Sequence, residues 1–173
     1  MKYIYFWQLV GFVFTVLFGV LLHFLYEWSG EFVFVALFSG VNESVWEHMK
    51  LLFYPMFIFA IFQSLFFKNS KHFWKIKLRV IILGLFLIPV IYYFYNGAIT
   101  KSSDWINIMI FVVSIAIAYL YENRLFKSEK HFKTTKKEAI VILIVIAILF
   151  GVFTFYPIEI GIFLDPSTNQ YGV

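Results

Sequence analysis

The sequence predicts an all-α fold, a polytopic integral membrane bundle with five transmembrane spans and one short re-entrant or interfacial half-helix. Of the 173 residues, 62% are hydrophobic and only 14% are charged, and the mean hydropathy is +0.84. Soluble domains average about 25% charged residues. Because a span needs about 20 apolar residues, the length allows five spans in a single membrane domain, 1–173, with no separate soluble domain.

The spans are predicted from apolar runs and from the polar residues that end them. The stretch 31–68 is too long for one span, since a helix of that length would reach about 57 Å against an apolar core of about 30 Å. Gly40 and Asn42 mark the break, because Gly relaxes the backbone and Asn can cap a new helix with Glu43 in its first turn. The predicted spans are about 3–26, 43–67, 76–95, 105–121 and 139–156, with the half-helix at about 32–39 and a turn-rich tail at 158–173.

Basic residues gather in two connections, 68–79 and 124–137, and this distribution predicts the topology. Together with Lys2 they hold twelve of the fourteen Lys and Arg residues, leaving Lys50 and Lys101 on the other side. The positive-inside rule then places the N-terminus in the cytoplasm and the C-terminus outside the cell membrane. Lys77 is predicted to belong to the first basic loop. Since topology explains the net charge of +4, we expect no nucleic-acid partner.

The segment from Asn42 to Lys50 is the candidate site, because it places acids, a histidine and a cation inside an otherwise apolar sequence. Such groups cost roughly 2.5–3.5 kcal/mol at a helix centre and usually face a cavity or a partner. Glu43 and Glu47 are four residues apart, as are Ser44 and His48, so on one helix the two pairs would occupy neighbouring strips.

His23 and Glu27 are also four apart, at the outer end of the first span. We expect all these groups to share one polar pocket near the extracytoplasmic surface. The predicted catalytic residues are Glu43, Glu47 and His48, since carboxylates and imidazoles act as general bases and acids. The remaining predicted pocket residues are Asn42, Ser44, Trp46, Asp165 and Tyr171.

A divalent metal such as zinc, manganese or iron is a further hypothesis, because nitrogen and oxygen ligands suit these ions. The predicted ligands are His23, Glu27, Glu47 and His48. No His-Glu-x-x-His motif is present, so this prediction depends only on the convergence of these residues. The absence of cysteine excludes thiolate ligands and thiol nucleophiles.

Three classes of function fit these predictions. The first is a hydrolase, metal-dependent or metal-free, that acts on a lipid or another small molecule. The second is a transporter or binding protein for an ion or small polar solute. The third is a structural or assembly protein without a catalytic site, in which polar groups hold the helices together. The expected partners are membrane lipid and a small polar molecule or lipid headgroup; the oligomeric state stays open.

Two motifs carry a resemblance to known proteins. The runs 41–48, Val-Asn-Glu-Ser-Val-Trp-Glu-His, and 163–172, with Phe-Leu-Asp-Pro and Tyr-Gly, resemble an uncharacterised family of small multi-pass bacterial membrane proteins over nearly the whole chain. The resemblance implies a membrane location and a joint importance of the two motifs. Trp46-x-His48 also resembles the progestin and adipoQ receptor group and its ceramidase relatives, which look like zinc-dependent lipid amidases. Their late His-x-x-x-His is absent here, so no site residue is carried over.

Overall fold

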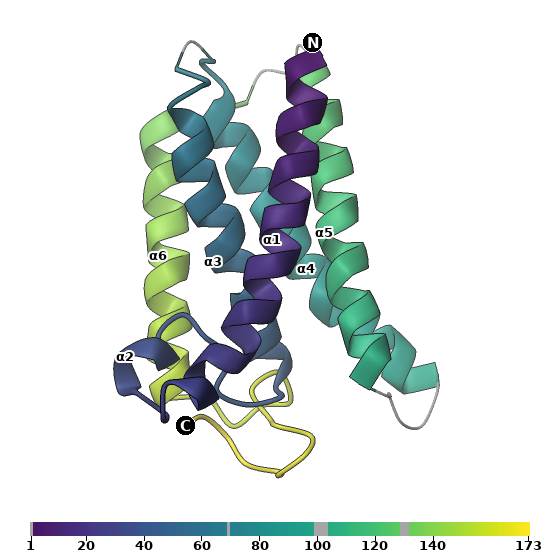
Figure 1. Cartoon of the computed structure of the whole chain (residues 1–173), viewed down its shortest axis with the longest axis vertical. Helices are drawn as coiled ribbons and strands as arrows, with labels where there is room; N and C mark the ends of the chain where they lie inside the picture. Colours follow the sequence, from purple (N-terminus) through teal and green to yellow (C-terminus); the bar gives the residue numbers. More distant parts are fainter. Residues whose placement is uncertain (1, 69, 99–103, 129–131) are drawn as a thin grey trace.

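The computed structural model describes residues 2–68, 70–98, 104–128 and 132–173, and the elements in these ranges are helical apart from one isolated β-bridge. Five of the helices, all except α2, are long and apolar enough to cross a membrane. The predicted all-α fold with five spans is therefore confirmed. The helices are α1 (Lys2–Trp28), α2 (Val33–Ala36), α3 (Val45–Ser64), α4 (Phe73–Ala98), α5 (Asp104–Lys127) and α6 (Lys136–Phe155) (Figure 1).

The predicted half-helix at 32–39 is a single turn of four residues, α2, and whether it re-enters a bilayer stays a prediction. The two ends of the bundle carry different segments. Figure 1 shows the N-terminus at one end with the α3–α4 and α5–α6 connections, and α2 and the C-terminal tail at the other. We call these the N-terminal end and the C-terminal end. Which side of the membrane each faces also stays a prediction, and Lys101 and Lys130 lie outside the described residues.

Helix α3 lies at the centre of the bundle, in contact with α1, α4, α5 and α6. Inside lipid, helices associate by close packing, which small residues allow. At Gly11 and Gly19, α1 comes so near its neighbours that an added Cβ would lie 2.6 Å from the ring of Phe59 in α3 and 2.4 Å from the ring of Phe111 in α5. The position of α1 therefore depends on these two glycines.

One basic residue lies in a different environment from the predicted one. Lys77, predicted in a basic loop, lies in α4 and is only 1% exposed. Its ammonium pairs with Glu122 of α5, which is fully buried. The prediction was wrong because a count of charges near a span end says nothing about the direction in which each side chain points.

Candidate functional site

The first residue of α3 decides which acids belong to that helix. Ser44 has an extended backbone, with φ −68° and ψ 154°, and its hydroxyl accepts the N–H of Glu47 at 3.3 Å. The Asn42 side chain in turn accepts the N–H of Ser44 at 2.9 Å. Serine is a strong N-cap, so the helix starts at Val45. The predictions that Asn42 is the cap and that Glu43 lies in the first turn are wrong.

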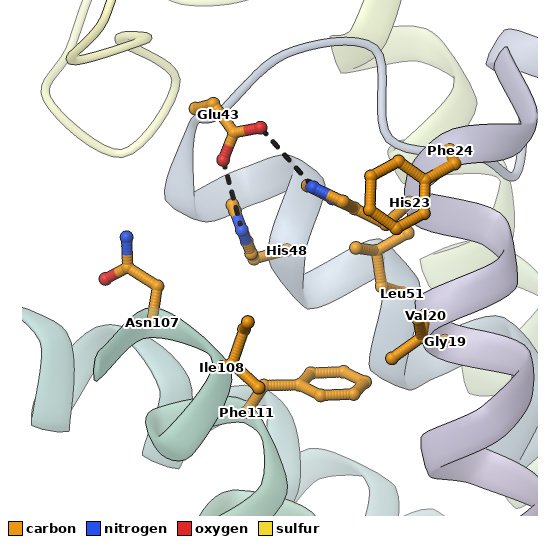
Figure 2. A pocket seen from close by; sticks show the side chains of 10 residues that line it. All are labelled: Gly19, Val20, His23, Phe24, Glu43, His48, Leu51, Asn107, Ile108 and Phe111. Carbon is orange, nitrogen blue, oxygen red and sulfur yellow. Dashed lines mark ion pairs between the residues drawn. The ribbon is translucent and has the colours of Figure 1, made fainter. Parts of the chain in front are cut away.

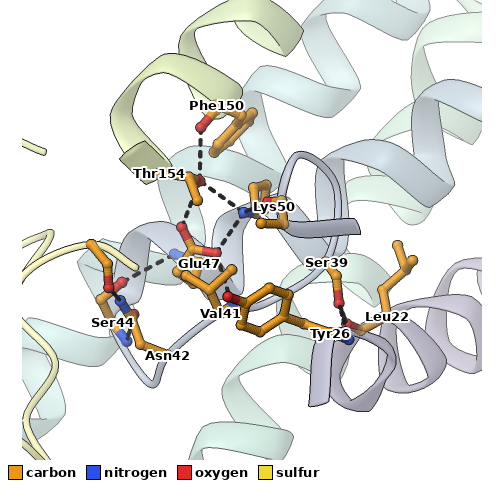
Figure 3. A network of polar contacts seen from close by, with 12 residues as sticks. Leu22, Tyr26, Ser39, Val41, Asn42, Ser44, Glu47, Lys50, Phe150 and Thr154 are labelled. Atoms are coloured by element: carbon orange, nitrogen blue, oxygen red, sulfur yellow. Dashed lines mark hydrogen bonds and ion pairs between the residues drawn. The ribbon is translucent and has the colours of Figure 1, made fainter. Parts of the chain in front are cut away.

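Glu47 is the acid of that first turn, and it belongs to a buried network (Figure 3). Its Oε2 lies 2.6 Å from the ammonium of Lys50 and accepts the N–H of Val41 at 3.1 Å. Its Oε1 accepts the hydroxyl of Thr154 in α6 at 2.9 Å. Lys50 also donates to that hydroxyl at 2.8 Å and to the carbonyl of Ala36 at 2.7 Å. We call these five residues the Glu47 network.

Contacts within the protein engage every charged atom of the Glu47 network. The three donors of the Lys50 ammonium have three acceptors, and both Glu47 oxygens accept hydrogen bonds, as a buried ion pair requires. These contacts join α3, α6 and the segment 36–41. They support a structural role for Glu47, whose predicted catalytic and metal-binding roles stay predictions.

Segment 36–41 is also fixed to the C-terminal end of α1. The Ser39 hydroxyl donates to the carbonyl of Leu22 and accepts the N–H of Tyr26 at 3.0 Å (Figure 3). The hydroxyl thus inserts between two groups that are helical hydrogen-bond partners, and such an insertion is a known cause of helix bending. His23 lies within this altered turn and is held beside the start of α3.

The C-terminal tail packs against the start of α3. The side-chain amide of Asn42 donates to the carbonyl of Gly172 at 2.9 Å. The N–H of Trp46, which has no partner within its own helix, donates to the carbonyl of Ile162 at 3.0 Å. The two motifs that carried the resemblance are therefore in direct contact.

Asp165 joins the tail to the loop that carries Glu43. Its carboxylate accepts the N–H of Ser167 at 2.7 Å and the hydroxyl of the same residue at 2.6 Å. Burial raises the pKa of Asp165, but the hydrogen bonds from Ser167, from Thr168 and from the backbone of Glu43 outweigh it, so the pKa lies below its usual value. Asp165 is therefore a structural anchor for the Glu43 loop.

A cavity of about 410 Å³ lies between α1, α3 and α5 near the C-terminal end. This volume falls in the usual range for small-molecule sites, about 300–1,000 Å³. Its polar groups are at one end and the rest of its wall is apolar (Figure 2). The lining residues are Gly19, Val20, His23, Phe24, Glu43, His48, Leu51, Asn107, Ile108 and Phe111.

Glu43 faces two imidazoles at the polar end of this cavity (Figure 2). Its Oε1 lies 3.5 Å from Nε2 of His23, and its Oε2 lies 3.6 Å from Nε2 of His48. The Glu43 side chain is 47% exposed. We call the three residues the Glu43 triad. Both distances exceed a hydrogen bond, so the carboxylate keeps capacity to bind another group.

The tautomer of His48 follows from its second contact. Its Nδ1 lies 2.9 Å from the carbonyl oxygen of Ser44. A carbonyl can only accept, so Nδ1 carries a proton and Nε2 points toward Glu43. The imidazole can then hold or release a proton at Nε2 without losing the bond that orients the ring.

The cavity brings together only part of the predicted site. His23, Glu43 and His48 meet there, whereas Glu47 lies in its own network and Glu27 is exposed on α1. The residues predicted for the pocket that do not line the cavity are Asn42, Ser44, Trp46, Asp165 and Tyr171. In the ranges that the structure describes, no group of three or more His, Asp or Glu side chains is arranged to hold a metal ion.

The comparisons with known proteins give a family. Residues 1–173 match the family of unknown function DUF6512. The chain belongs to this family. No curated protein and no solved structure matches it. The predicted resemblance to an uncharacterised family is thus confirmed in part, while the role of the two motifs and a bacterial origin stay predictions.

Two residues of this DUF6512 chain, Thr154 and Asn107, escaped the sequence analysis, and Lys50 was included in the candidate segment without a partner. The pattern Ser44-x-x-Glu47 is a capping signature and could have placed the start of α3 correctly. A lone lysine after that signature, Lys50, could have indicated a buried partner for Glu47. Asn107 gave no signal, because its position on the cavity wall depends on how α5 packs.

Proposed function

We propose that the protein binds a membrane amphiphile, a lipid or lipid-like molecule, in the cavity and hydrolyses a bond of its headgroup. The observation that carries this proposal is the position of the Glu43 triad at the polar end of a cavity with otherwise apolar walls. Such a division matches a molecule with one polar and one apolar end.

The rim of the cavity supports entry from the lipid. Val20, Phe24 and Ile108 line the cavity and are also 44%, 41% and 58% exposed. In a bundle of spans, exposed apolar side chains at this depth face lipid tails. An acyl chain can therefore pass between α1 and α5 while the headgroup stays at the triad.

The triad has the groups that hydrolysis of an ester or amide needs. In the proposed step, Glu43 takes a proton from a water molecule as the water oxygen attacks the carbonyl carbon. His48 starts the step as the imidazolium and donates the proton at Nε2 to the leaving oxygen or nitrogen as the old bond breaks. Glu43 then returns its proton to His48. His23 holds the carboxylate from the opposite side.

Asn107 supplies the group that orients the headgroup. Its side-chain Oδ1 is buried and has no hydrogen-bond partner among the described residues, although the residue lines the cavity. A buried polar atom without a partner is costly. A rotation of the Asn107 side chain would bring this oxygen into the cavity, where a headgroup hydroxyl or amine that donates to it removes the cost.

The test is hydrolysis of a total membrane lipid extract by the purified protein in mixed micelles. Release of a headgroup or acyl product that is abolished in Glu43→Gln and His48→Asn supports the proposal. Glu138→Gln is the matched control, because Glu138 is an exposed acid of a capping box that glutamine preserves. Equal product release by wild type and Glu43→Gln overturns it.

Metal dependence stays a prediction with its own test. Elemental analysis of the purified protein that finds zinc, manganese or iron, lost in His23→Ala and His48→Ala, supports a metal in the reaction. The same preparations serve for the hydrolysis assay, so both results refer to one sample.

Transport is a second candidate, and one feature of α1 favours it. The polar side chains of this apolar helix, Gln8, Thr15 and His23, are spaced by seven and eight residues and thus share one face. Gln8 and Thr15 are buried against the other helices. Polar residues that line the inside of a bundle often mark a solute path. Uptake of a lipid analogue into proteoliposomes that is lost in Glu43→Gln, without hydrolysis, supports transport instead.

A further inference from the structure

A second buried ion pair lies at the opposite end of the bundle from the cavity. Lys77 is the fifth residue of α4, and Glu122 is five residues before the end of α5. At about 1.5 Å per residue, both lie roughly 6–8 Å inside their helices. Lys77 is 1% exposed and Glu122 is 0% exposed. Neither residue belongs to the cavity or to the Glu47 network.

The surroundings of this pair are aromatic. The Lys77 ammonium lies 5.8 Å from the ring centre of Phe59, 5.5 Å from that of Phe73 and 5.7 Å from that of Tyr119. Ring faces attract a cation but accept no full hydrogen bond. Among the described residues, the carboxylate of Glu122 is the hydrogen-bonding partner that the ammonium contacts.

Glu122 is equally poor in partners. In the part of the chain that the structure describes, neither of its carboxylate oxygens has a hydrogen bond beyond the contact with Lys77. The Lys50–Glu47 pair, by contrast, is held by hydrogen bonds with three other residues, Val41, Ala36 and Thr154. A buried ion pair without such bonds is expensive, whereas a neutral amine and a neutral acid at the same place cost less free energy.

In the described ranges, Lys77 and Glu122 form an ion pair with each other and with no further residue. The groups on neighbouring helices are the uncharged Phe59 of α3 and Tyr119 of α5, whose hydroxyl lies 3.0 Å from that of Thr15 in α1. The nearby cations are engaged elsewhere. Arg79 donates to the carbonyl of Lys75, and Lys127 contacts the hydroxyl of Tyr5.

We propose that Lys77 and Glu122 form a proton-exchange site at the N-terminal end of the bundle. The proton moves from the Lys77 ammonium to the carboxylate of Glu122, which leaves a neutral amine and a neutral carboxylic acid. No other bond changes and the total charge is unchanged. The acid then holds a proton that it can release toward the N-terminal end, about one and a half helical turns away.

This site is independent of the amphiphile proposed for the cavity, so it can be tested without any ligand. The probe is the infrared carbonyl band of a protonated carboxylic acid, recorded on the intact protein in lipid from mildly acidic to mildly alkaline pH. We expect such a band in wild type and its complete loss in Glu122→Gln. Glu138→Gln serves as control and should leave the band unchanged.

Lys77→Arg separates proton exchange from a purely structural ion pair. Arginine keeps the positive charge but does not give up its proton in proteins, so Glu122 should stay ionised and the band should disappear although the helices remain folded. Circular dichroism and the elution volume of the variant check folding. If the band is absent from wild type, or persists in Lys77→Arg and Glu122→Gln, the proposal is overturned.

Discussion

Glu43 and Glu47 are two acids four residues apart with opposite surroundings. Glu47 is 2% exposed, and each of its oxygens accepts a hydrogen bond or contacts an ammonium within 3.1 Å. The Glu43 side chain is 47% exposed, and its nearest charged partners are 3.5 and 3.6 Å away. Both oxygens of Glu47 are engaged by contacts within the protein, whereas the carboxylate of Glu43 can still bind a ligand.

The difference comes from one residue between them. Ser44 caps α3, so Glu43 stays in the preceding loop and Glu47 enters the first turn. There Glu47 does not complete a capping box, because its carboxylate reaches Val41 and Lys50 instead. Glu47 is buried, and its ion pair with Lys50 takes the place of a capping hydrogen bond. Glu43 stays outside the helix, so its carboxylate is available for a ligand.

The largest effect is expected when the Glu47 network is broken. Glu47→Ala leaves the buried ammonium of Lys50 without its counter-charge, so we expect a loss of about 3–5 kcal/mol in the free energy of unfolding. Chemical denaturation in detergent micelles measures it. The pair replacement Glu47→Met with Lys50→Met should recover much of this loss, since no lone charge remains. Equal stability of wild type and Glu47→Ala would contradict the structural role.

Gly19→Ala tests the cavity that Glu43 faces without altering either acid. The added Cβ would lie 2.4 Å from the ring of Phe111 and 2.9 Å from the carbonyl of Leu51. Overpacking of this kind costs about 1–3 kcal/mol, and we expect α1 to shift and binding of a lipid probe to weaken. Gly40→Ala is the control, because its nearest atom would lie at 3.6 Å. Similar melting curves for the two variants would show that α1 is not closely packed at this point.

Glu43→Gln should separate binding from stability. The Glu43 side chain is half-exposed, and the charged groups nearest to its carboxylate are the two imidazoles at 3.5 and 3.6 Å. We therefore expect the free energy of unfolding to change by no more than about 0.5 kcal/mol. A charged group in a ligand contact contributes about 1.5–3 kcal/mol, so affinity for the bound lipid should fall roughly 10- to 100-fold. Native mass spectrometry of the protein with co-purified lipid measures this. A large loss of stability in Glu43→Gln would place this acid in the same class as Glu47.

The smallest effect is expected at Asp165, whose pKa is lowered from 3.8 in the folded protein. A lowered pKa means that the ionised carboxylate stabilises the fold. This stabilisation is present above about pH 3.8 and is lost as the pH falls through the folded-state pKa. We expect acid to release the tail from Trp46, visible as a change of tryptophan fluorescence. In Asp165→Asn this transition should be absent, and an unchanged acid transition would assign it to another group.

Some features of the site could be predicted from the sequence, and others could not. The apolar runs and the polar residues that end them predicted the five spans, and the imidazoles of His23 and His48 were correctly expected to meet a carboxylate. The acids predicted to share a pocket with these imidazoles were Glu27, Glu43 and Glu47, and of the three only Glu43 lies beside them among the described residues. The spacing rule for helices holds only inside a helix, and it failed here because the helix starts one residue after the cap at Ser44.

The sequence by itself determined the class of protein, because twenty apolar residues in a row leave a chain few alternatives to crossing a membrane. Only the tertiary structure decided which charges are buried. Lys77 and Glu122 are 45 residues apart and meet because α4 and α5 pack together, and Lys50 meets Thr154 through the packing of α3 and α6. Burial of a side chain depends on the rotation of one helix against another, which hydropathy does not encode.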